Sequence, residues 1–514
     1  MSTSENETFW REFLTGLTDP RPGRCPPGDL RRPRRDHEGH RPRGLRLDAS
    51  YMTMYPRPRD LQGRPLQPVS GVDQSSLLGR SSGVQRHFHG ACSSYHNRFV
   101  SAIDVLVRRP RQIVRTLRSV LHFRRLELDP IARRLRNTAS AHDLRRVARR
   151  RLPRGVFDYI DGGAEDERTL EANSSAFGRI SFVPRVLRDV GGVDPSAVVL
   201  GRRLPLPLVL APTGFTRIAH PDGEIAVARA AASVGLPYTL STLSTRSIEE
   251  VASASEGDKW FQVYVWRDRG LVKDMIERAA SANYSTLMLT VDTAVFGKRE
   301  RDVRRGFTLP PKVGVGTLLD GLVHPGWTWD FVRSEPIRFA NVTGTGVGDG
   351  TSAVTLAQYV NEQFDPALSW TDVEWMRSVW RGPIVLKGVQ SVEDARLAAD
   401  AGVDAIALSN HGGRQLDGAP AIIDLVAPVA DAVGGRLDIL CDGGIRRGSD
   451  IVKAVALGAT ACMAGRAYLY GLAAGGERGV QHALHLLDED VRRTMALVGA
   501  RSVAQLTRDL IITR

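Results

Sequence analysis

Short apolar runs that end in polar or glycine residues, each followed by a helical stretch, recur along the sequence from residue 206 onward. The runs occupy residues 206–214, 236–242, 259–266, 286–293, 383–389, 405–412, 438–444 and 461–467. Eight strands alternating with helices favour an α/β fold, a closed (β/α)8 barrel of the TIM type with a long insertion after the fourth strand. A doubly wound open sheet is the alternative, but no strand–GxGxxG–helix unit opens the pattern.

The region before the barrel differs from it in charge. Residues 1–150 contain 30 lysine and arginine residues against 14 acidic ones, whereas the remaining 364 residues contain 40 against 43. Residues 1–100 are rich in Arg, Pro, Gly and Ser and have little hydrophobic periodicity, which predicts a disordered N-terminal extension. Residues 101–150 predict basic N-terminal helices, either a solvated face or a surface for an anionic membrane. Residues 151–514 remain for the barrel domain.

Several function classes find little support in the sequence. Aromatic residues are sparse in the basic region and no nucleic-acid-binding module is visible, so we expect no nucleic-acid partner. The four cysteines, Cys25, Cys92, Cys441 and Cys462, show neither metal-ligand spacing nor the density of a disulfide scaffold, which fits a reducing compartment and no metal site. Without an apolar run of about 18 residues or a secretory segment, we expect a cytoplasmic protein that could also sit peripherally on the inner face of the cell membrane.

Polar side chains stand at the carboxyl ends of the predicted strands, where the active sites of such barrels lie. The first four strands end in mostly small hydroxyl and amide groups, namely Thr213, Gly214, Ser241, Gln262, Tyr264, Thr290 and Asp292. The last four end in mostly charged groups and glycines, namely Lys387, His411, Arg414, Asp442, Gly443, Gly444, Gly465 and Arg466. Together they suit a large planar heteroaromatic ligand with a phosphate tail.

The loops after strands seven and eight are the usual phosphate site of these barrels. They read "DGGIRRGSD" (442–450) and "GRA" (465–467) here. Glycines let backbone N–H groups approach a phosphate, and Arg446 and Arg466 can form charge-assisted hydrogen bonds with it. We therefore expect the phosphate tail between these two loops.

Lys387 and Asp292 each end an otherwise apolar strand. Lys387 is either a lysine extending to water or a cation beside a ring that becomes negative on reduction. Asp292 would be costly to bury without a partner. A carboxylate near His411 would stabilise the imidazolium formed when the histidine accepts a proton.

With these residues assembled, the chain from about 140 to 510 resembles the FMN-dependent 2-hydroxy acid dehydrogenase and oxidase family, and most of all its bacterial L-lactate dehydrogenases. "SNHGGRQLDG" (409–418) matches the active-site signature of that family. "FQVYVW", "LTVDT" followed by "GKRERD", "LKGV", "DGGIRRGSDIVKAVALGA" and "GRAYLYGLAAGGE" match in the same order. "LPRGVFDYIDGGAEDERTLEAN" (152–173) resembles the helices that precede the barrel in this family.

The resemblance implies a role for each matching residue. His411 would be the base, Asp292 would support its protonated form, and Tyr264 would bond the substrate oxygen. Arg414 and Arg299, with Tyr159, would hold the substrate carboxylate. FMN would be held by Thr213, Gly214, Ser241, Gln262, Thr290 and Lys387, with its phosphate on Asp442, Gly443, Gly444, Arg446, Gly465 and Arg466. A homotetramer is also implied.

The resemblance implies oxidation of an L-2-hydroxy acid, with electrons passed to a quinone or cytochrome. Leu243 stands where glycolate oxidases have tryptophan, which favours lactate over glycolate. Gly214 stands where many oxygen-using members have alanine, although lactate monooxygenases share the glycine. An oxidase or monooxygenase that uses oxygen is therefore the alternative. Trp327, Trp329 and Phe331, in the insertion over residues 307–350, could be core, lid or membrane contact.

Two other classes fit the residues less well. A non-enzymatic barrel has no reason to gather these groups at one mouth, and an FMN-dependent isomerase would not need His411 together with two arginines. The signature itself has a physical logic, because the glycines between His411 and Arg414 let the backbone turn tightly. The route of the electrons, hydride or carbanion, is open at this point.

Overall fold

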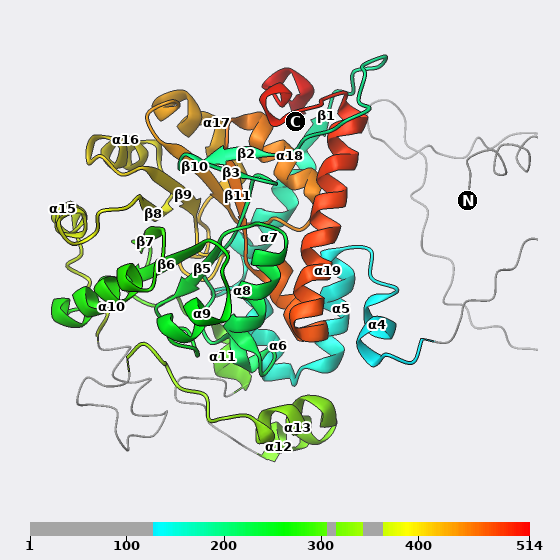
Figure 1. Cartoon of the computed structure of the whole chain (residues 1–514), viewed down its shortest axis with the longest axis vertical. Helices are drawn as coiled ribbons and strands as arrows, with labels where there is room; N and C mark the ends of the chain where they lie inside the picture. The colour runs from blue at the N-terminus through cyan, green and yellow to red at the C-terminus, as the bar shows by residue number, and fades with distance from the viewer. Residues whose placement is uncertain (1–126, 306–314, 343–362) are drawn as a thin grey trace, which may run out of the picture. The chain divides into compact units, whose positions relative to one another are not determined.

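The computed structural model describes residues 127–305, 315–342 and 363–514. Eight parallel strands form a closed barrel in chain order (Figure 1). They are β4 (Leu208–Leu210), β5 (Tyr238–Ser241), β6 (Lys259–Tyr264), β7 (Thr286–Thr290), β8 (Ile384–Val389), β9 (Ala405–Ser409), β10 (Asp438–Asp442) and β11 (Ala461–Ala464). All eight predicted strands are present, so the prediction of a (β/α)8 barrel is confirmed and the open sheet is excluded. The predicted extension over residues 1–100 lies outside the described residues.

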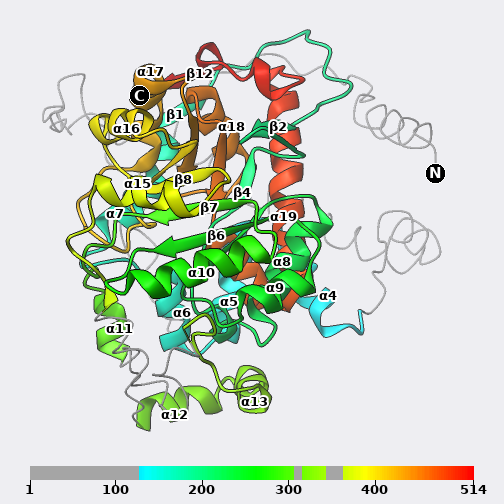
Figure 2. The ribbon, with the colours of Figure 1, turned by 60° about the vertical axis from the view of Figure 1, so that its left-hand side comes forward.

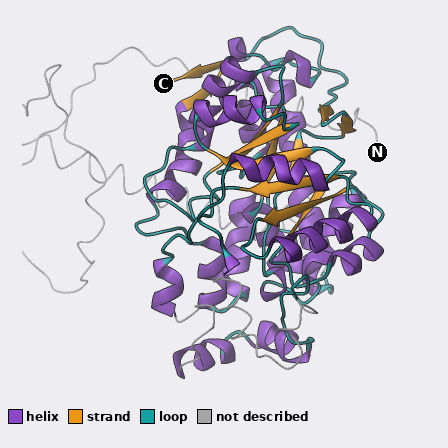
Figure 3. Cartoon of the chain, turned by 90° about the vertical axis from the view of Figure 1, so that its left-hand side faces the viewer, coloured by secondary structure: helices purple, strands orange, loops and turns teal. Residues whose placement is uncertain are grey.

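Helices surround the barrel, which occupies the interior (Figure 3). The strands β4 to β11 are followed in turn by α8 (Gly223–Ser233), α9 (Ile248–Ala254), α10 (Arg269–Ser281), α15 (Trp370–Val379), α16 (Val392–Asp400), α17 (Ile422–Val433), α18 (Gly448–Leu457) and α19 (Arg466–Val498). Side-chain caps explain where several begin. Ser247, Asp268 and Ser391 each accept a backbone N–H in the first turn of α9, α10 and α16.

In the described part of the chain, four helices precede the barrel. They are α4 (Pro130–Leu135), α5 (Ala141–Arg151), α6 (Arg154–Asp161) and α7 (Arg168–Ser175). The part of the basic segment that the structure describes, from residue 127, is therefore largely helical, as predicted. Both α4 and α5 pack against α19, with Leu135, Leu144 and Ala148 buried. Residues 101–126 lie outside the described residues.

Two-stranded sheets and 3-10 turns accompany the barrel in the described residues. The hairpin of β2 (Ala197–Val199) and β3 (Arg202–Leu204) inserts Val199 and Leu204 into the apolar cluster that also contains Trp260 and Ala461. A second small sheet pairs β1 (Ile180–Phe182) with β12 (Ile511–Thr513). The 3-10 turns are η1 (Ala176–Arg179), η2 (Thr216–Ile218), η3 (Val503–Gln505) and η4 (Arg508–Leu510).

The insertion after the fourth barrel strand, β7, is present as predicted. Its described part contains α11 (Glu300–Arg305), α12 (Val315–Leu322) and α13 (Pro325–Arg333), and α15 begins after it. The α12–α13 hairpin (315–333) lies beyond α6 and α11 (Figures 1 and 2). The indole Nε1 of Trp327 donates to the Ile218 carbonyl at 2.7 Å, whereas the Trp329 side chain is 59% exposed. Trp327 thus faces the protein and Trp329 faces solvent.

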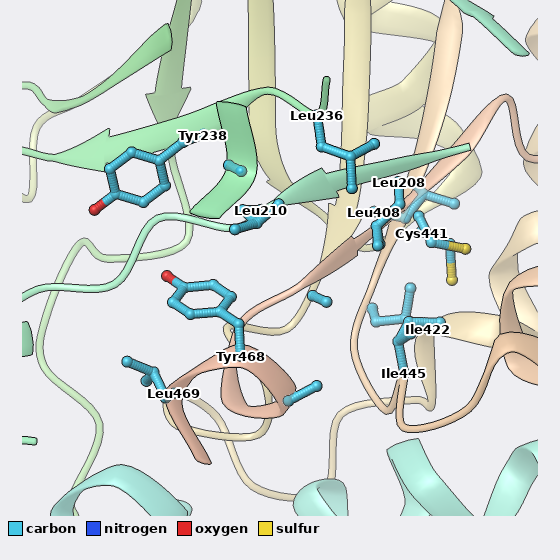
Figure 4. Packing of buried hydrophobic residues seen from close by; sticks show 14 of the residues in the cluster. Leu208, Leu210, Leu236, Tyr238, Leu408, Ile422, Cys441, Ile445, Tyr468 and Leu469 are labelled. Atoms are coloured by element: carbon cyan, nitrogen blue, oxygen red, sulfur yellow. The ribbon is translucent and has the colours of Figure 1, made fainter. Parts of the chain in front are cut away.

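The two-residue period of the strands divides the core into two layers. Leu208 and Leu210 of β4 and Leu408 of β9 point outward and pack with residues of the helices such as Ile422 and Tyr468 (Figure 4). The alternate residues, including Val209, Met288, Val385, Ala407 and Leu440, fill the barrel interior. The inward phase, continued toward the carboxyl ends, reaches Gln262, Thr290, Lys387, Ser409 and Asp442. The two-residue period of the strands therefore places polar groups together at the carboxyl end of the barrel.

Candidate active site

A cavity of about 170 Å³ opens at the carboxyl ends of the strands. Fifteen of the eighteen residues predicted from the sequence line it, namely Tyr159, Thr213, Gly214, Ser241, Tyr264, Arg299, Lys387, His411, Arg414, Asp442, Gly443, Gly444, Arg446, Gly465 and Arg466. The other three are next to lining residues: Gln262 accepts a hydrogen bond from Ser241, Asp292 contacts His411, and Thr290 pairs with Lys387 on the adjacent strand. All eighteen therefore gather in one place, although their first and last members are about 300 residues apart.

His411 and Asp292 form a hydrogen-bonded pair at the wall of the cavity. The imidazole Nδ1 lies 3.0 Å from the Asp292 Oδ1, and the Asp292 side chain is 2% exposed. His411 adopts a left-handed φ of 58°, and its backbone N–H donates to the Ser409 hydroxyl at 3.0 Å. This strained turn directs the imidazole into the cavity and leaves Nε2 for another partner.

Burial and charge set the protonation of the pair. Burial lowers the pKa of His411, although Asp292 opposes this effect, and Lys387 and Arg299 lower the pKa further. Burial raises the pKa of Asp292, but His411 and Lys387 outweigh it and the net pKa is lowered. At neutral pH the pair is therefore a neutral imidazole beside a carboxylate, the state that can accept a proton.

Lys387 lies at the cavity wall in a chain of polar contacts. Its Nζ lies 2.9 Å from an Asp442 carboxylate oxygen and donates to the Ser409 hydroxyl at 3.0 Å. That hydroxyl donates to Asp442 at 2.8 Å. Burial works against the charged amine, but Asp442 and Asp292 outweigh it and the pKa of Lys387 is raised. Lys387 is thus a fixed cation and does not extend to solvent. Its strand bulges at Gly388, whose φ of 110° and missing side chain admit Asp292.

Two arginines share the cavity close to the histidine. Arg414 donates from Nη1 to the carbonyls of Tyr159, at 2.6 Å, and Gly162, at 3.0 Å, and its guanidinium lies 5.1 Å from the Tyr159 ring centre. Burial and the neighbouring Arg299 lower the pKa of Arg414 to about 9. Among the described residues, the buried Nε of Arg299 has no hydrogen-bond partner. A carboxylate between the guanidiniums would relieve both their repulsion and their desolvation.

Tyr264 is buried, and its neighbours include the Asp292 carboxylate and the two arginines of the cavity. Burial, followed by the Asp292 carboxylate, raises its pKa above the usual range. The phenol therefore keeps its proton and can donate a hydrogen bond into the cavity. Its ring packs against Phe364 with ring centres 5.1 Å apart.

Two buried donors next to the cavity-lining residues suit a flavin ring. The Ser241 hydroxyl donates to the Gln262 Oε1 at 3.0 Å. Within the described residues, the Gln262 Nε2 and the Thr290 hydroxyl are buried without a hydrogen-bond partner, which is rare unless a ligand supplies one. The carbonyl and nitrogen acceptors of an isoalloxazine ring meet that need. The two donors, the Lys387 cation and the cavity that Gly214 lines therefore fit FMN.

The predicted phosphate loops also line the cavity, but their members differ in what they contact. A side chain on Gly444 would collide with the Asn173 carbonyl, so this glycine is needed for packing against α7. Arg446 lines the cavity and donates to the Ile445 carbonyl at 2.8 Å. Arg466 donates to the carbonyls of Ile160, Gly412 and Gly162. Three of its five N–H groups thus hold neighbouring backbone, and at most two are left for a phosphate.

Some residues of the cavity were not predicted. Phe339 follows the α12–α13 hairpin, is 4% exposed and packs on Phe215 with ring centres 5.6 Å apart. Phe296 also lines the cavity. These residues carry no sequence signal, because an apolar residue in an irregular segment looks the same whether it faces a core or a cavity. Ser409, in contrast, lies within the signature and could have been assigned from its inward strand phase.

Comparison with known proteins decides the family. The model of the family described as FMN-dependent dehydrogenase matches residues 148–513. The chain belongs to the FMN-dependent dehydrogenase family. It is 45% identical over 377 residues to an L-lactate dehydrogenase of Caulobacter vibrioides, an alignment that covers 73% of this chain and 98% of that protein. The protein is therefore a flavoenzyme, with FMN as cofactor, that oxidises 2-hydroxy acids.

Solved structures agree with this assignment. The crystal structure of the monotopic membrane protein (S)-mandelate dehydrogenase superposes with a TM-score of 0.71 at 41% identity, covering 74% of this chain and all of that one. A mandelate oxidase variant with (S)-mandelic acid gives a TM-score of 0.62 at 40% identity, covering 74% and 99% of the two chains. The sequence of this chain is thus about equally similar to that of a dehydrogenase and that of an oxidase.

Proposed function

We propose that this FMN-dependent dehydrogenase oxidises L-lactate to pyruvate and passes the electrons to a quinone or cytochrome. The His411–Asp292 pair and the Arg414–Arg299 pair, gathered at one cavity, carry this proposal. A 2-hydroxy acid needs both, because its carboxylate must be held while its C–H and O–H bonds are broken and a base takes up a proton.

Each side chain has a defined task in the proposed reaction. Arg414 and Arg299 bind the carboxylate and orient C2 toward His411, while Tyr264 donates to the substrate oxygen. His411 takes up a substrate proton at Nε2, and the Asp292 carboxylate stabilises the resulting imidazolium. FMN, when bound, accepts the two electrons that the substrate loses. Gln262, Thr290, Lys387 and the loops around Arg446 and Gly465 hold it.

The apolar residues near Gly214 suit the methyl group of lactate, and they also suit larger apolar side chains. Leu243 lines the cavity in close contact with Gly214, because a methyl group added to Gly214 would lie only 3.0 Å from the Leu243 Cβ. Phe215 and Phe339 give this end of the cavity an apolar, partly aromatic wall. The similarity to enzymes that act on mandelate makes (S)-mandelate the main competing substrate.

Peripheral contact with a membrane follows from the same proposal, because quinones reside there. Among the described residues, none of the helices combines the length and apolarity needed to cross a bilayer. The hairpin instead exposes Trp329, Phe331 and Val332. Beside it lies the basic end of α5, joined to the hairpin by the 2.7 Å ion pair between Arg151 and Asp330. Exposed apolar side chains next to arginines suit the surface of an anionic bilayer.

Anaerobic mixing of the yellow holoenzyme with candidate substrates tests the proposal. L-lactate should bleach the visible flavin absorption faster than D-lactate, glycolate or (S)-mandelate. The reduced enzyme should then be reoxidised faster by a quinone analogue than by oxygen. Faster bleaching by (S)-mandelate would make mandelate the preferred substrate. Faster reoxidation by oxygen than by the quinone analogue would make the enzyme an oxidase or monooxygenase. The homotetramer stays a prediction, which light scattering would test.

A further inference from the structure

Asp161, the last residue of α6, is a buried carboxylate that no sequence motif singled out. Its residue surface is 4% exposed. Arg145 of α5 donates to its two oxygens at 2.5 and 2.7 Å, and the Tyr470 hydroxyl of α19 donates at 2.7 Å. Arg301 of α11 donates at 3.2 Å. One carboxylate therefore joins three helices to the end of α6.

The turn that follows Asp161 is tied to the neighbours of both cavity arginines. The backbone N–H of Ala164 donates to the Gly413 carbonyl at 2.8 Å, directly before Arg414 in the chain. The N–H of Glu165 donates to the Lys298 carbonyl at 2.8 Å, directly before Arg299. The four residues from 162 to 165 thus bridge the two segments that carry the guanidiniums.

Arg414 is also held by the end of α6 itself. Its two hydrogen bonds go to carbonyls on either side of Asp161, those of Tyr159 and Gly162. These carbonyls lie at the negative end of the helix, which stabilises a guanidinium placed there. The position of the Arg414 guanidinium therefore depends on where α6 ends.

Arg301 links the end of α6 to α11, the helix that follows Arg299. It lies two residues after Arg299 and contacts Asp161, Asp158 at 3.7 Å and Glu167. All three acids lie on α6 or on the turn that follows it. Arg301 therefore fixes α11 to the same helix end that holds Arg414, and through α11 it fixes the segment that carries Arg299.

We propose that Asp161, acting with Arg301, is a positioning residue that sets the separation and orientation of the Arg414 and Arg299 guanidiniums for the substrate carboxylate. This inference rests on the proposed function, since it assumes that the two arginines bind that carboxylate. Asp161 does not line the cavity and touches no reacting atom. Its effect is exerted through the end of α6, the turn and α11.

The test compares Asp161→Asn with the wild-type holoenzyme. Substrate and product analogues that bear a carboxylate should bind less tightly because the two guanidiniums are misaligned. We expect the KM for L-lactate and the Kd for oxalate to rise by between roughly tenfold and a hundredfold. The limiting rate of flavin reduction should change less than KM, and the FMN content should stay at the wild-type level. Oxalate binding is measured by calorimetry and needs no turnover.

Asp372→Asn is the matched control. Asp372 is also a largely buried acceptor of an arginine, with the Arg269 Nη2 at 2.8 Å, but it caps α15 away from the cavity. Both variants should unfold at a lower temperature than the wild type, and Asp161→Asn alone should weaken oxalate binding. Equal oxalate affinity in wild type, Asp161→Asn and Asp372→Asn would overturn the proposal and leave Asp161 a purely structural role.

Arg301 provides a second measurement in case Asp161→Asn does not fold. Its side chain is about one-third exposed, so Arg301→Met leaves Asp161 with Arg145 and Tyr470. Arg301→Met should raise the Kd for oxalate, and Arg301→Lys should restore part of the affinity. If Arg301→Met binds oxalate as the wild type does, the proposal fails. A wild-type enzyme that binds oxalate but is not reduced by any 2-hydroxy acid would contradict the proposed function alone.

Discussion

The signature loop after β9 (409–418) and the α12–α13 hairpin after β7 both belong to connections that leave the carboxyl end of the barrel, but they are held differently. In the loop, Asn410 exchanges hydrogen bonds with Asn173, and Gln415 donates to the Asp292 and Val295 carbonyls. The hairpin is held at Trp327, Asp330 and Asp320, which accepts the Arg154 backbone N–H, and it leaves Trp329 exposed. Dense anchoring is what a site for chemistry requires, whereas a free apolar face is what a contact surface requires.

His411→Gln is the most severe test of this comparison, because it removes the group to which the signature loop owes its proposed role in the chemistry. The amide keeps the shape of the pocket but cannot take up the substrate proton. We expect FMN to stay bound while the rate of flavin reduction by L-lactate falls by on the order of 10²–10⁴ or more. Anaerobic stopped-flow absorbance measures the rate. Reduction at the wild-type rate would remove His411 from the mechanism.

Replacing Asp292 with Asn should cost less and also change the pH dependence. Asp292 raises the pKa of His411, so its loss lowers that pKa further. Because the base must be neutral, kcat/KM rises with pH through this pKa, and the rise should occur at lower pH in the variant. The plateau should fall on the order of a hundredfold, since the imidazolium loses its carboxylate. An unshifted acid limb would mean that another group titrates.

Arg414→Lys tests the loop at its carboxylate-binding end. An ammonium cannot make the planar two-point contact of a guanidinium or keep both carbonyl bonds to α6. We expect kcat/KM for L-lactate to fall roughly tenfold to a hundredfold, mostly through KM. Steady-state kinetics with a quinone analogue give both constants. Unchanged kinetics would place the carboxylate elsewhere in the cavity.

Trp329→Ala probes the hairpin and should have the smallest effect. Flavin reduction by L-lactate in solution should stay at the wild-type rate, while binding to anionic vesicles should weaken about threefold to tenfold as apolar area is lost from the interface. Binding should also weaken with salt. Leu187→Ala removes a fully exposed apolar side chain far along the chain from the hairpin and serves as the control in vesicle sedimentation. Equal binding of both variants would remove the hairpin from the membrane contact.

The sequence alone determined the barrel and most of the cavity. Local periodicity predicts each strand, and the carboxyl ends of parallel strands converge whatever the helices do, so Lys387, His411 and Asp442 were expected at one mouth. The signature supplied Arg414, and the resemblance supplied Arg299 and Tyr159. These inferences succeed because they depend on residues a few positions apart and on one rule of topology.

Only the tertiary structure decided which partners these side chains have. Arg466 was expected on a phosphate, yet it also holds three carbonyls around α6 and the signature loop. Trp327 and Trp329 are two positions apart, and packing against Ile218 separates their roles. Asp161 meets Tyr470 across 309 positions of sequence. Such contacts depend on how distant segments pack, and the free energy of burying a charge is settled by those neighbours rather than by local pattern.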